Sequence, residues 1–330
     1  MKQPKLISVI MSVYKEPIEW LKVTIDSILA QTYQNFEFII VCDNPDYKEA
    51  ISLLSAYEVN DGRIKSIINE NNFGLTKSLN IALGASIGQF IARMDADDIA
   101  HIDRFSKQVD YLERHQDCMV CCTDARVIDK NGNVLRDRQT PGAFNILQLF
   151  LYSPIIHPSV MFRGEVLQLR NPLYNEEFRF SQDYELWSFL FLKDVTFGKI
   201  DEALMDYRIS NGQISNLNNN KQKANSIIIS KAFSKELLLR IIDYKEEYSI
   251  ERCLTEVSNQ YLKIADTEKV IYQEMLFRMY YTISRHSPLY AVKYFFDKNH
   301  LAFINGYLKN MHLILSIIIK HRYDMYLINI

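Results

Sequence analysis

The chain has 330 residues, which is long enough for two domains of ordinary size. Hydrophobic residues make up 48% of it and charged residues 24%, which is typical of a globular protein and excludes disorder over most of the chain. The formal net charge of −2 also argues against a nucleic-acid-binding protein, because such proteins are normally clearly basic.

This small net charge hides an uneven distribution. Residues 213–330 carry 16 basic and 11 acidic side chains, a net charge of +5. The residues before them carry 22 basic and 29 acidic side chains, a net charge of −7. Such asymmetry hints at a charged surface partner for the basic part.

The first hundred residues alternate between predicted strands and predicted helices. The apolar runs that predict buried strands are Leu6–Val13, Phe36–Val41, Arg63–Ile68 and Gln89–Met94. The predicted helices between them cover residues 17–30, a polar segment ending near 57, and 75–85. Four alternations at this spacing predict an α/β fold with a mostly parallel central sheet and helices on both faces.

The next hundred residues mix further strands with two helices. We expect helices over residues 102–114 and 181–193, and a hairpin around Lys130–Asn133. Strands are expected at 118–123 and 157–162, with two short strands within 195–209. From residue 216 onward the pattern is helical, so we place a domain boundary near 215 and expect domains at 1–215 and 216–330.

The five cysteines do not form a disulfide framework. They are Cys42, Cys118, Cys121, Cys122 and Cys253, an odd number that favours a reducing compartment. His115 close to the central three raises the alternative of a zinc site, but no second ligand pair follows at a suitable spacing. The run from 118 to 123 is better interpreted as a short buried strand.

Several common sites lack their motifs. The sequence contains no G-x-G-x-x-G, no G-x-x-x-x-G-K-[ST] and no G-x-S-x-G, so an ordinary dinucleotide site, a P-loop and a serine hydrolase elbow are unsupported. His157 stands alone before a predicted strand, where a histidine is more often structural than catalytic.

Asp95, Asp97 and Asp98 follow directly after a predicted buried strand. Ligands bind beyond the carboxyl ends of strands in open α/β sheets, and carboxylates spaced by one residue can face one point. Such oxygen ligands suit Mg²⁺ or Mn²⁺, which in turn bridges phosphate oxygens. The alternative is a solvated loop in which Asp98 caps the next helix.

Two more aspartates have equally open roles. Asp183 falls in the first turn of the predicted apolar helix, where it is either a general base or a dipole-complementing acid behind a Ser181 cap. Asp43 follows the second predicted strand, where a carboxylate can contact a nucleobase or ribose. Its alternative is an Asx-turn with Asn44 and Pro45.

Taken jointly, these pieces resemble the family 2 glycosyltransferases of the bacterial polysaccharide type, which have the GT-A nucleotide-diphospho-sugar transferase fold. Six segments of residues 5–215 match, in the family's order and at its usual separations. They are Ile7–Tyr14, Phe38–Asp43, Asn72–Asn80, Arg93–Asp98, His157–Arg163 and Gln182–Trp187. Residues 216–330 match no family that we can name.

The resemblance implies transfer of a sugar from a nucleotide-diphosphate donor, a UDP-sugar above all, with inversion and with Mg²⁺ or Mn²⁺ as cofactor. Asp183 would be the catalytic base, Asp97 the metal-binding aspartate of a D-x-D motif, and Asp95 its neighbour near the ribose. The residues that the resemblance places at the nucleotide sugar are Ser12, Tyr14, Glu16, Asp43, Asn72, Lys77, Arg93, Asp95, Ala96 and Asp97. Possible donor or acceptor contacts are His157, Gln182, Trp187 and Arg208.

The sequence also departs from the family pattern. Many relatives have two consecutive acids followed by Gly-Ser where this chain has Cys42–Pro45, so its base and ribose contacts can differ. Gln182 replaces an acid, and Ser210 stands where many relatives have a metal-ligating histidine. Arg208 either contacts the diphosphate or is an ordinary surface charge at a strand end.

The implied acceptor is a hydroxyl of a glycan or of a lipid-linked sugar, in synthesis of a cell-surface polysaccharide such as capsule or O-antigen. We expect a cytoplasmic location, since no signal peptide or spanning segment is recognised. The basic, apolar stretch 308–323 suggests peripheral contact with anionic lipid, and a core helix is its alternative.

Two rival function classes stay open. A sugar nucleotidyltransferase would carry a loop rich in Gly and Arg near its start, and residues 12–17 have no Gly. A non-catalytic sugar-nucleotide-binding protein would not need both Asp97 and Asp183.

Overall fold

The computed structural model describes residues 4–140 and 153–210 and, within 220–236, the helical positions 220–222, 224–226, 228, 229, 232, 233 and 236. The chain divides into two units, residues 1–229 and 230–330. The predictions made for Cys253 and for the stretch 308–323 lie outside the described residues, and the boundary near 215 stays a prediction.

Four parallel strands form the first half of the sheet, as predicted. They are β1 (Ile7–Val13), β2 (Phe36–Cys42), β3 (Ile64–Ile68) and β4 (Phe90–Asp95). Their order is β3-β2-β1-β4, and every neighbouring pair is parallel. All four strands therefore end at the same edge of the sheet.

Five later strands extend this sheet and make it mixed. They are β5 (Ile99–Ala100), β6 (Val120–Ile128), β7 (Val134–Arg138), β8 (Met161–Arg163) and β9 (Phe197–Arg208). Beyond β4 the order continues β8-β6-β9-β5, with β7 paired to β6 in the predicted hairpin. β8 is antiparallel to β4 and β6, whereas β6 and β9 run parallel.

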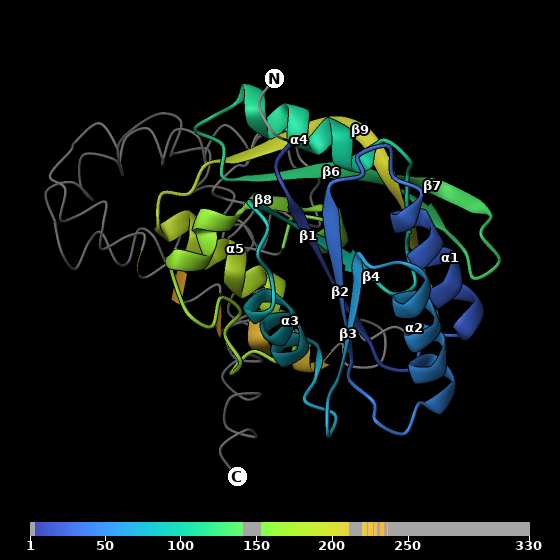
Figure 1. Ribbon diagram of the computed structural model, residues 1–330. Coiled ribbons are helices and arrows are strands. Elements are labelled where there is room, and N and C mark those ends of the chain that lie inside the picture. Colours follow the sequence, from blue (N-terminus) through green and yellow to red (C-terminus); the bar gives the residue numbers. More distant parts are fainter. Residues whose placement is uncertain are drawn as a thin grey trace, which may run out of the picture. The chain divides into compact units, whose positions relative to one another are not determined.

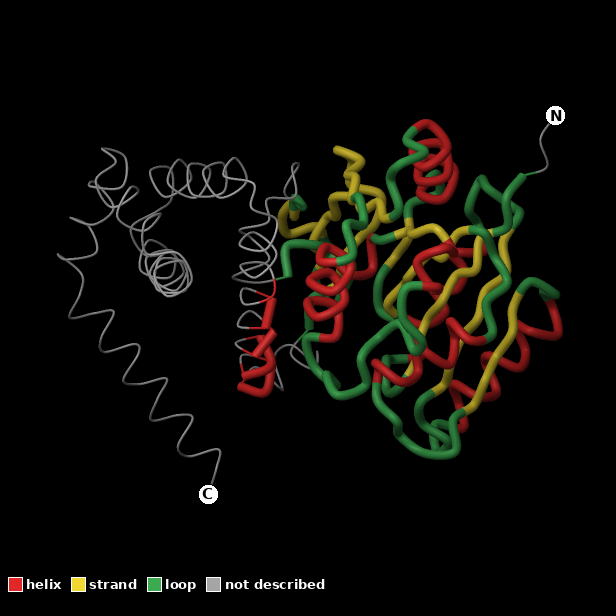
Figure 2. Tube along the Cα trace, turned by 90° about the vertical axis from the view of Figure 1, so that its left-hand side faces the viewer, coloured by secondary structure: helices red, strands yellow, loops and turns green. Residues whose placement is uncertain are grey.

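Helices cover both faces of the parallel strands (Figure 1). They are α1 (Ile18–Leu29), α2 (Lys48–Asn60), α3 (Leu75–Gly84), α4 (Arg104–Arg114) and α5 (Gln182–Leu192). α1 and α2 lie on one face of β1–β4 and α3 on the other. Seen from the side, the strands lie between these helical layers (Figure 2).

Side-chain alternation along the strands explains this layering. Ile7, Val9, Met11 and Val13 of β1 all point to the core cluster that α1 shares through residues such as Ile25. The alternate residues of β1 turn to the face that carries α3, and Ser8 and Ile10 among them are fully buried. A strand buried on both faces reads as a continuous apolar run, which is why the sequence pattern found it.

Three predicted strands, in two regions of the chain, differ from the structure. The stretch expected as one strand at 157–162 is a short 3₁₀ turn, His157–Ser159, followed by β8. Pro158 explains the difference, because proline has no backbone N–H to donate to a strand neighbour. The two short strands expected within 195–209 are one strand, β9, whose register against β6 shifts twice near Asp124.

The cysteine-rich stretch begins a strand, as predicted. Cys42, Cys118, Cys121 and Cys122 are free and buried. Burial raises the pKa of Cys118 to about 11 and that of Cys122 to about 12. We therefore interpret these cysteines as small core residues.

Gly88 offers a test of how tightly β1 and β4 are joined. A Cβ atom at Gly88 would lie 2.5 Å from the Ser8 nitrogen, while Gly62 has open space around it. We expect Gly88→Ala to lower the free energy of unfolding by roughly 1–3 kcal/mol, because the β1 backbone must shift. Gly62→Ala, the matched control, should change it by about 0.5 kcal/mol or less. Urea titration measures both, and equal midpoints would contradict the prediction.

Candidate active site

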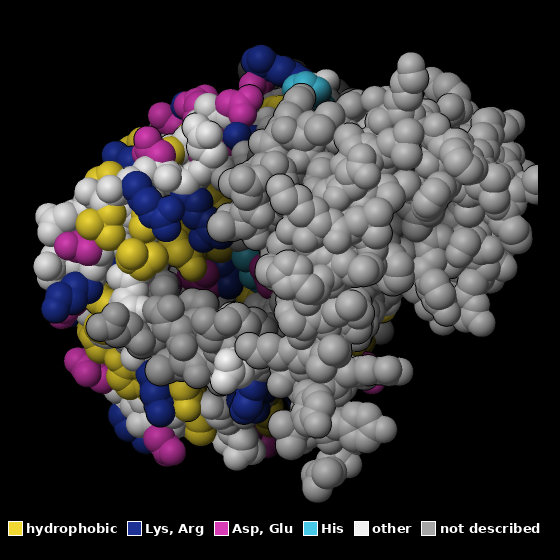
Figure 3. Space-filling view, turned by 180° about the vertical axis from the view of Figure 1, so that it is seen from behind, with side chains coloured by type: hydrophobic (Ala, Val, Ile, Leu, Met, Phe, Trp, Pro, Cys, Tyr) yellow, Lys and Arg dark blue, Asp and Glu magenta, His cyan; other side chains and the backbone are white. Residues whose placement is uncertain are grey.

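A cavity of about 800 Å³ opens at the carboxyl ends of β1 and β4. Open α/β sheets bind ligands at this edge. Acidic, basic and histidine side chains gather in a hollow of the space-filling view (Figure 3). The predicted site residues that line the cavity are Tyr14, Glu16, Arg93, Asp95, Asp97, His157, Gln182 and Asp183. Ser210 also lines it.

Three carboxylates crowd together after β4. Asp95, Asp97 and Asp98 each present an oxygen, and these atoms lie within 4.8 Å of one another. Asp98 is fully buried, and one of its oxygens accepts the backbone N–H of Arg208 at 2.8 Å. Its Oδ2 has no hydrogen-bond partner among the described residues. Burial and the nearby charges of Asp97 and Asp95 raise the pKa of Asp98 well above its ordinary value.

These residues fit a divalent cation. Carboxylate oxygens are the ligands that Mg²⁺ and Mn²⁺ prefer. A cation there would offset the repulsion within the cluster and would give the buried Asp98 Oδ2 a partner. Asp97 belongs to this cluster and also lines the cavity, so a cation bound there would lie next to a ligand in the cavity.

Arg208 makes hydrogen bonds to the turn that runs from Asp95 to Asp98, which we call the acidic turn. Its Nε donates to the Asp97 carbonyl at 2.7 Å, and its Nη1 donates to the Asp129 carbonyl at 3.1 Å. The side chain is only 4% exposed, so the interpretation as an ordinary surface charge is wrong. Arg208 does not line the cavity, and its backbone and side-chain bonds instead fix the acidic turn.

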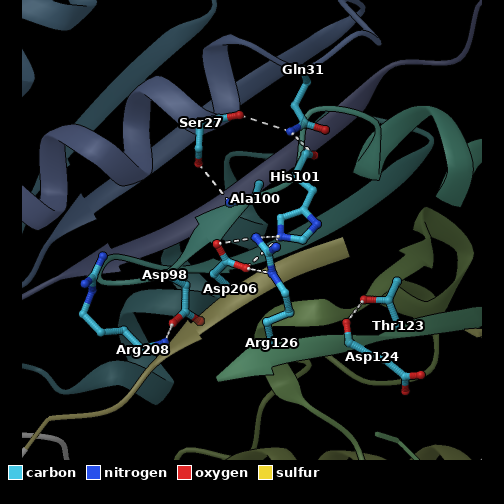
Figure 4. A network of polar contacts seen from close by, with 10 residues as sticks. All are labelled: Ser27, Gln31, Asp98, Ala100, His101, Thr123, Asp124, Arg126, Asp206 and Arg208. Atoms are coloured by element: carbon cyan, nitrogen blue, oxygen red, sulfur yellow. Dashed lines mark hydrogen bonds and ion pairs between the residues drawn. The ribbon is translucent and has the colours of Figure 1, made fainter. Parts of the chain in front are cut away.

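A second group of polar contacts fixes β5, the strand that follows this turn (Figure 4). Asp206 accepts a hydrogen bond from Arg126 Nε at 2.7 Å and lies 2.8 Å from His101 Nε2. The Ser27 hydroxyl of α1 accepts the Ala100 N–H at 3.0 Å. Strands β5, β6 and β9 and helix α1 therefore all brace the acidic turn.

The helix-cap interpretation of Asp98 is wrong. β5 separates Asp98 from α4, which begins at Arg104 with Asp103 at its N-cap position. The carboxylate of Asp98 points to the backbone of β9 and not to a helix.

Arg93 is a buried cation beside the acidic turn. It lines the cavity, is 2% exposed, and forms an ion pair with Asp95 through Nη2. Its Nε and Nη1 have no hydrogen-bond partner among the described residues. Both of these nitrogens are themselves buried.

His157 is a neutral group at the same wall. Burial, and secondarily the charge of Arg93, lowers the pKa of His157 well below its ordinary value. Its Nε2 lies 2.8 Å from the Tyr174 hydroxyl, and Trp187 packs edge-on against its ring. Trp187 is fully buried and does not itself reach the cavity.

Asp183 lies in the first turn of α5 and faces the cavity. Its Oδ2 accepts the hydroxyl hydrogen bond of Ser153 at 2.9 Å. Burial raises the pKa of Asp183, and the Ser153 hydrogen bond and the Arg93 charge work against that rise. The expected Ser181 cap makes no capping hydrogen bond, and its backbone is left-handed with φ of 62°.

The loop after β1 forms another part of the lining. Glu16 folds back so that its Oε2 accepts the N–H of Tyr14 at 2.7 Å and of Lys15 at 3.1 Å. Burial raises the pKa of Glu16. Trp20 lines the cavity beside this loop, so aromatic and polar surfaces lie side by side there.

Asp43 follows β2 and is bonded to the loop after β3. Its carboxylate accepts the backbone N–H groups of Phe73 and Gly74, both at 2.8 Å, and the Asn69 amide at 2.7 Å. It is 2% exposed and does not line the cavity. The Asx-turn there is made by Asn44, whose Oδ1 accepts the Asp46 N–H, so that interpretation of Asp43 is wrong.

Four other expected residues stand behind or beside the cavity and not among its lining. They are Ser12, Asn72, Lys77 and Ala96. Asn72 accepts a hydrogen bond from the cavity residue Arg179 at 2.9 Å, and the Lys77 ammonium lies 4.1 Å from the centre of the Phe73 ring.

Comparison with known proteins agrees with this geometry. The family model described as "Glycosyl transferase family 2" matches residues 8–169. The uncharacterized glycosyltransferase MJ1057 of Methanocaldococcus jannaschii is 38% identical over 209 residues, covering 62% of this chain and 71% of the relative. The O-antigen biosynthesis glycosyltransferase WbnJ of Escherichia coli is 32% identical, covering 62% and 80%.

The chain belongs to glycosyltransferase family 2. Its fold is the GT-A fold, as the resemblance implied. The solved structure of S. aureus TarS residues 1–349 with UDP-GlcNAc has a TM-score of 0.58 at 17% identity and covers 83% of this chain and 80% of that one. The chain spans half of the longer TarS structure.

Some lining residues of this family 2 transferase were missed from the sequence. They are Lys15, Arg138, Ser153, Arg179 and Tyr207. Tyr207 is adjacent to Arg208, which the resemblance named as a possible donor or acceptor contact, so the sequence did carry a local signal for Tyr207. The other four come from loops or a strand end with no periodic or motif signal, and only the folded chain brings them to the cavity.

No helix among the described residues is long and apolar enough to cross a membrane.

The buried Asp98 gives this family member a testable pH dependence. Its raised pKa means that the folded, metal-free protein keeps the Asp98 proton to higher pH than the unfolded chain, so stability falls as pH rises through that range. Asp98→Asn carries no such charge. In EDTA, we expect its melting temperature to fall less between pH 5 and pH 8 than that of the wild type.

The same scans with Mn²⁺ supply the second measurement. Mn²⁺ should raise the melting temperature of the wild type more than that of Asp98→Asn, because the variant offers one carboxylate fewer. A steeper fall in the variant, or an equal Mn²⁺ effect, would contradict the role of Asp98.

Proposed function

We propose that this chain is an inverting glycosyltransferase that moves a sugar from a UDP-sugar to a hydroxyl of a glycan or lipid-linked acceptor. One observation carries the proposal: Asp183, a half-buried carboxylate with a raised pKa, lines the same cavity as Asp95 and Asp97. The proposed base and the proposed metal-binding carboxylates therefore face one cavity. The fold likeness to TarS with UDP-GlcNAc and the identity to WbnJ support the donor and acceptor classes.

The donor would lie along the strand ends. Tyr14 and Glu16 in the loop after β1 would border the nucleoside, and the Asp95–Asp97 turn would face the diphosphate. Asp97, together with Asp95 or Asp98, would hold Mg²⁺ or Mn²⁺. When bound, that cation would neutralise charge on the departing diphosphate. Asp43, Asn72 and Lys77 would act from outside the cavity by shaping the loop after β3.

Asp183 would be the general base. It would take the proton of the acceptor hydroxyl while that oxygen attacks the anomeric carbon. The bond from this carbon to the diphosphate oxygen breaks, and its electron pair leaves with the nucleoside diphosphate. Positive charge develops on the sugar ring, as in glycoside hydrolysis. Such a displacement inverts the anomeric centre and needs no enzyme nucleophile.

The surrounding groups suit this role. A base that works near neutral pH benefits from a pKa above that of an exposed aspartate, and burial supplies the rise. Ser153 and Arg93 limit the rise, so that the carboxylate form stays accessible. His157 and Gln182, which line the cavity, would be available to orient sugar oxygens.

The charge asymmetry motivates a peripheral membrane location. The segment with the net charge of +5 would favour an anionic surface near a lipid-linked acceptor. Absence of sedimentation with anionic liposomes would count against this part of the proposal.

Asp183→Asn tests the base. A thermal-shift screen of nucleotide sugars, with and without Mn²⁺, first identifies the donor through the rise in melting temperature. We expect the variant to keep that rise and to lose about 10²–10⁴-fold in kcat, because asparagine cannot accept the proton. Release of the nucleoside diphosphate measures the rate.

Glu177→Gln is the matched control, since it removes an exposed carboxylate six residues away and should leave kcat unchanged. Full transfer by Asp183→Asn would overturn the assignment of the base.

Ser153→Ala tests how the base is tuned. The Ser153 hydroxyl donates to Asp183 and lowers its pKa, so its removal should raise that pKa further. Because the base must be ionised, the acid limb of kcat/KM against pH should move to higher pH, while the rate on the plateau changes less. An acid limb that stays in place or moves to lower pH would show that Ser153 does not tune Asp183.

A further inference from the structure

One wall of the cavity comes from beyond the part of the chain that matches the family model. The match ends at residue 169. Gln222 and Ser226 nevertheless line the cavity together with Asp183. Residues 220–222 and 224–226 are helical, and both belong to the same unit as the sheet.

This helical segment is bonded to the turn that begins α5. The Asn225 side-chain amide donates to the Phe180 carbonyl at 2.7 Å. The Ser181 hydroxyl donates to the Gln222 carbonyl at 3.2 Å and lies 3.4 Å from the Ser226 hydroxyl. Two consecutive residues of the turn are therefore held from the same segment.

The turn needs an external support. Ser181 has a left-handed backbone, which is costly for a residue other than glycine unless its surroundings impose it. Its hydroxyl makes no hydrogen bond to the first turn of α5, so the helix start lacks the usual side-chain cap. Asp183 is the second residue of this helix, and its direction depends on how the turn is held.

We propose that Gln222, Asn225 and Ser226 complete the acceptor side of the active site. Asn225 is a positioning residue that fixes the Phe180–Ser181 turn and so aims Asp183. Gln222 and Ser226 bind the acceptor, which must lie against the base that takes its proton. This inference rests on the proposed transferase function.

The chemistry of the wall indicates the class of acceptor. Its side chains are an amide and a hydroxyl, and Gln182 and Ser153 next to Asp183 add the same kinds of group. Such neutral donors and acceptors match the hydroxyl groups of a sugar residue. We therefore assign a sugar unit to the end of the acceptor that receives the new bond.

The test uses the full chain with Asn225→Ala, Asn225→Gln and, as a matched control, Ile228→Ala, which changes an exposed residue of the same segment. With the donor from the thermal-shift screen, Asn225→Ala should lower kcat at least tenfold while the nucleotide-induced rise in melting temperature is kept. Asn225→Gln, which retains the amide, should recover part of the rate, and Ile228→Ala should match the wild type.

Hydrogen exchange tests the hydrogen bond from Asn225 to Phe180 without an activity assay. Asn225→Ala should speed exchange of the backbone amides at 181–184, and Ile228→Ala should not. Unchanged exchange and unchanged kcat would overturn the positioning role. A wild type that binds nucleotide but transfers to no acceptor would instead overturn the proposed function, and exchange would still decide the role of Asn225.

Acceptor binding is tested separately with octyl glycosides of glucose and galactose. Gln222→Ala and Ser226→Ala should raise the acceptor KM severalfold with a smaller effect on kcat. An unchanged acceptor KM in both variants would overturn this assignment.

Discussion

Repulsion among carboxylates at the end of β4 is the constraint on which the rest of the site depends. Asp98 is fully buried and Asp95 and Asp97 are half-buried, so their charges need fixed counterparts. Arg93 pairs with Asp95, while Arg208 supplies a backbone N–H to Asp98 and holds the Asp97 carbonyl. The proposed divalent cation would offset the negative charge that remains in this cluster.

The sequence was sufficient for the part of the fold whose local pattern and burial agree. β1 to β4 read as apolar runs because helices bury both of their faces, and their parallel order followed from the alternation with helices. The pattern failed once at a local residue whose effect it did not include and once where a distant contact decides the structure. Pro158 turns a predicted strand into a 3₁₀ turn, and β6 keeps β9 continuous through an exposed acidic stretch around Asp201.

The candidate site divides in a similar way. Asp95, Asp97 and Asp183 could be located because each follows or begins an element that the sequence reveals. Asp43 was found equally easily, yet its carboxylate holds the Phe73–Gly74 backbone outside the cavity. A motif places a residue at a strand end but does not say which neighbour will occupy its oxygens. Ser153 could not be found at all, since thirty residues separate it from Asp183.

This division has a consequence for specificity. The proposed donor end consists of strand ends and adjoining loops, whose geometry the sheet fixes. The proposed acceptor end consists of the left-handed turn at Ser181 together with Gln222, Asn225 and Ser226, which lie outside the sheet. Substitutions in that segment would then change the acceptor while the donor end is untouched. The class of donor would therefore follow from the family motifs, whereas the acceptor would follow from contacts that this chain makes outside them.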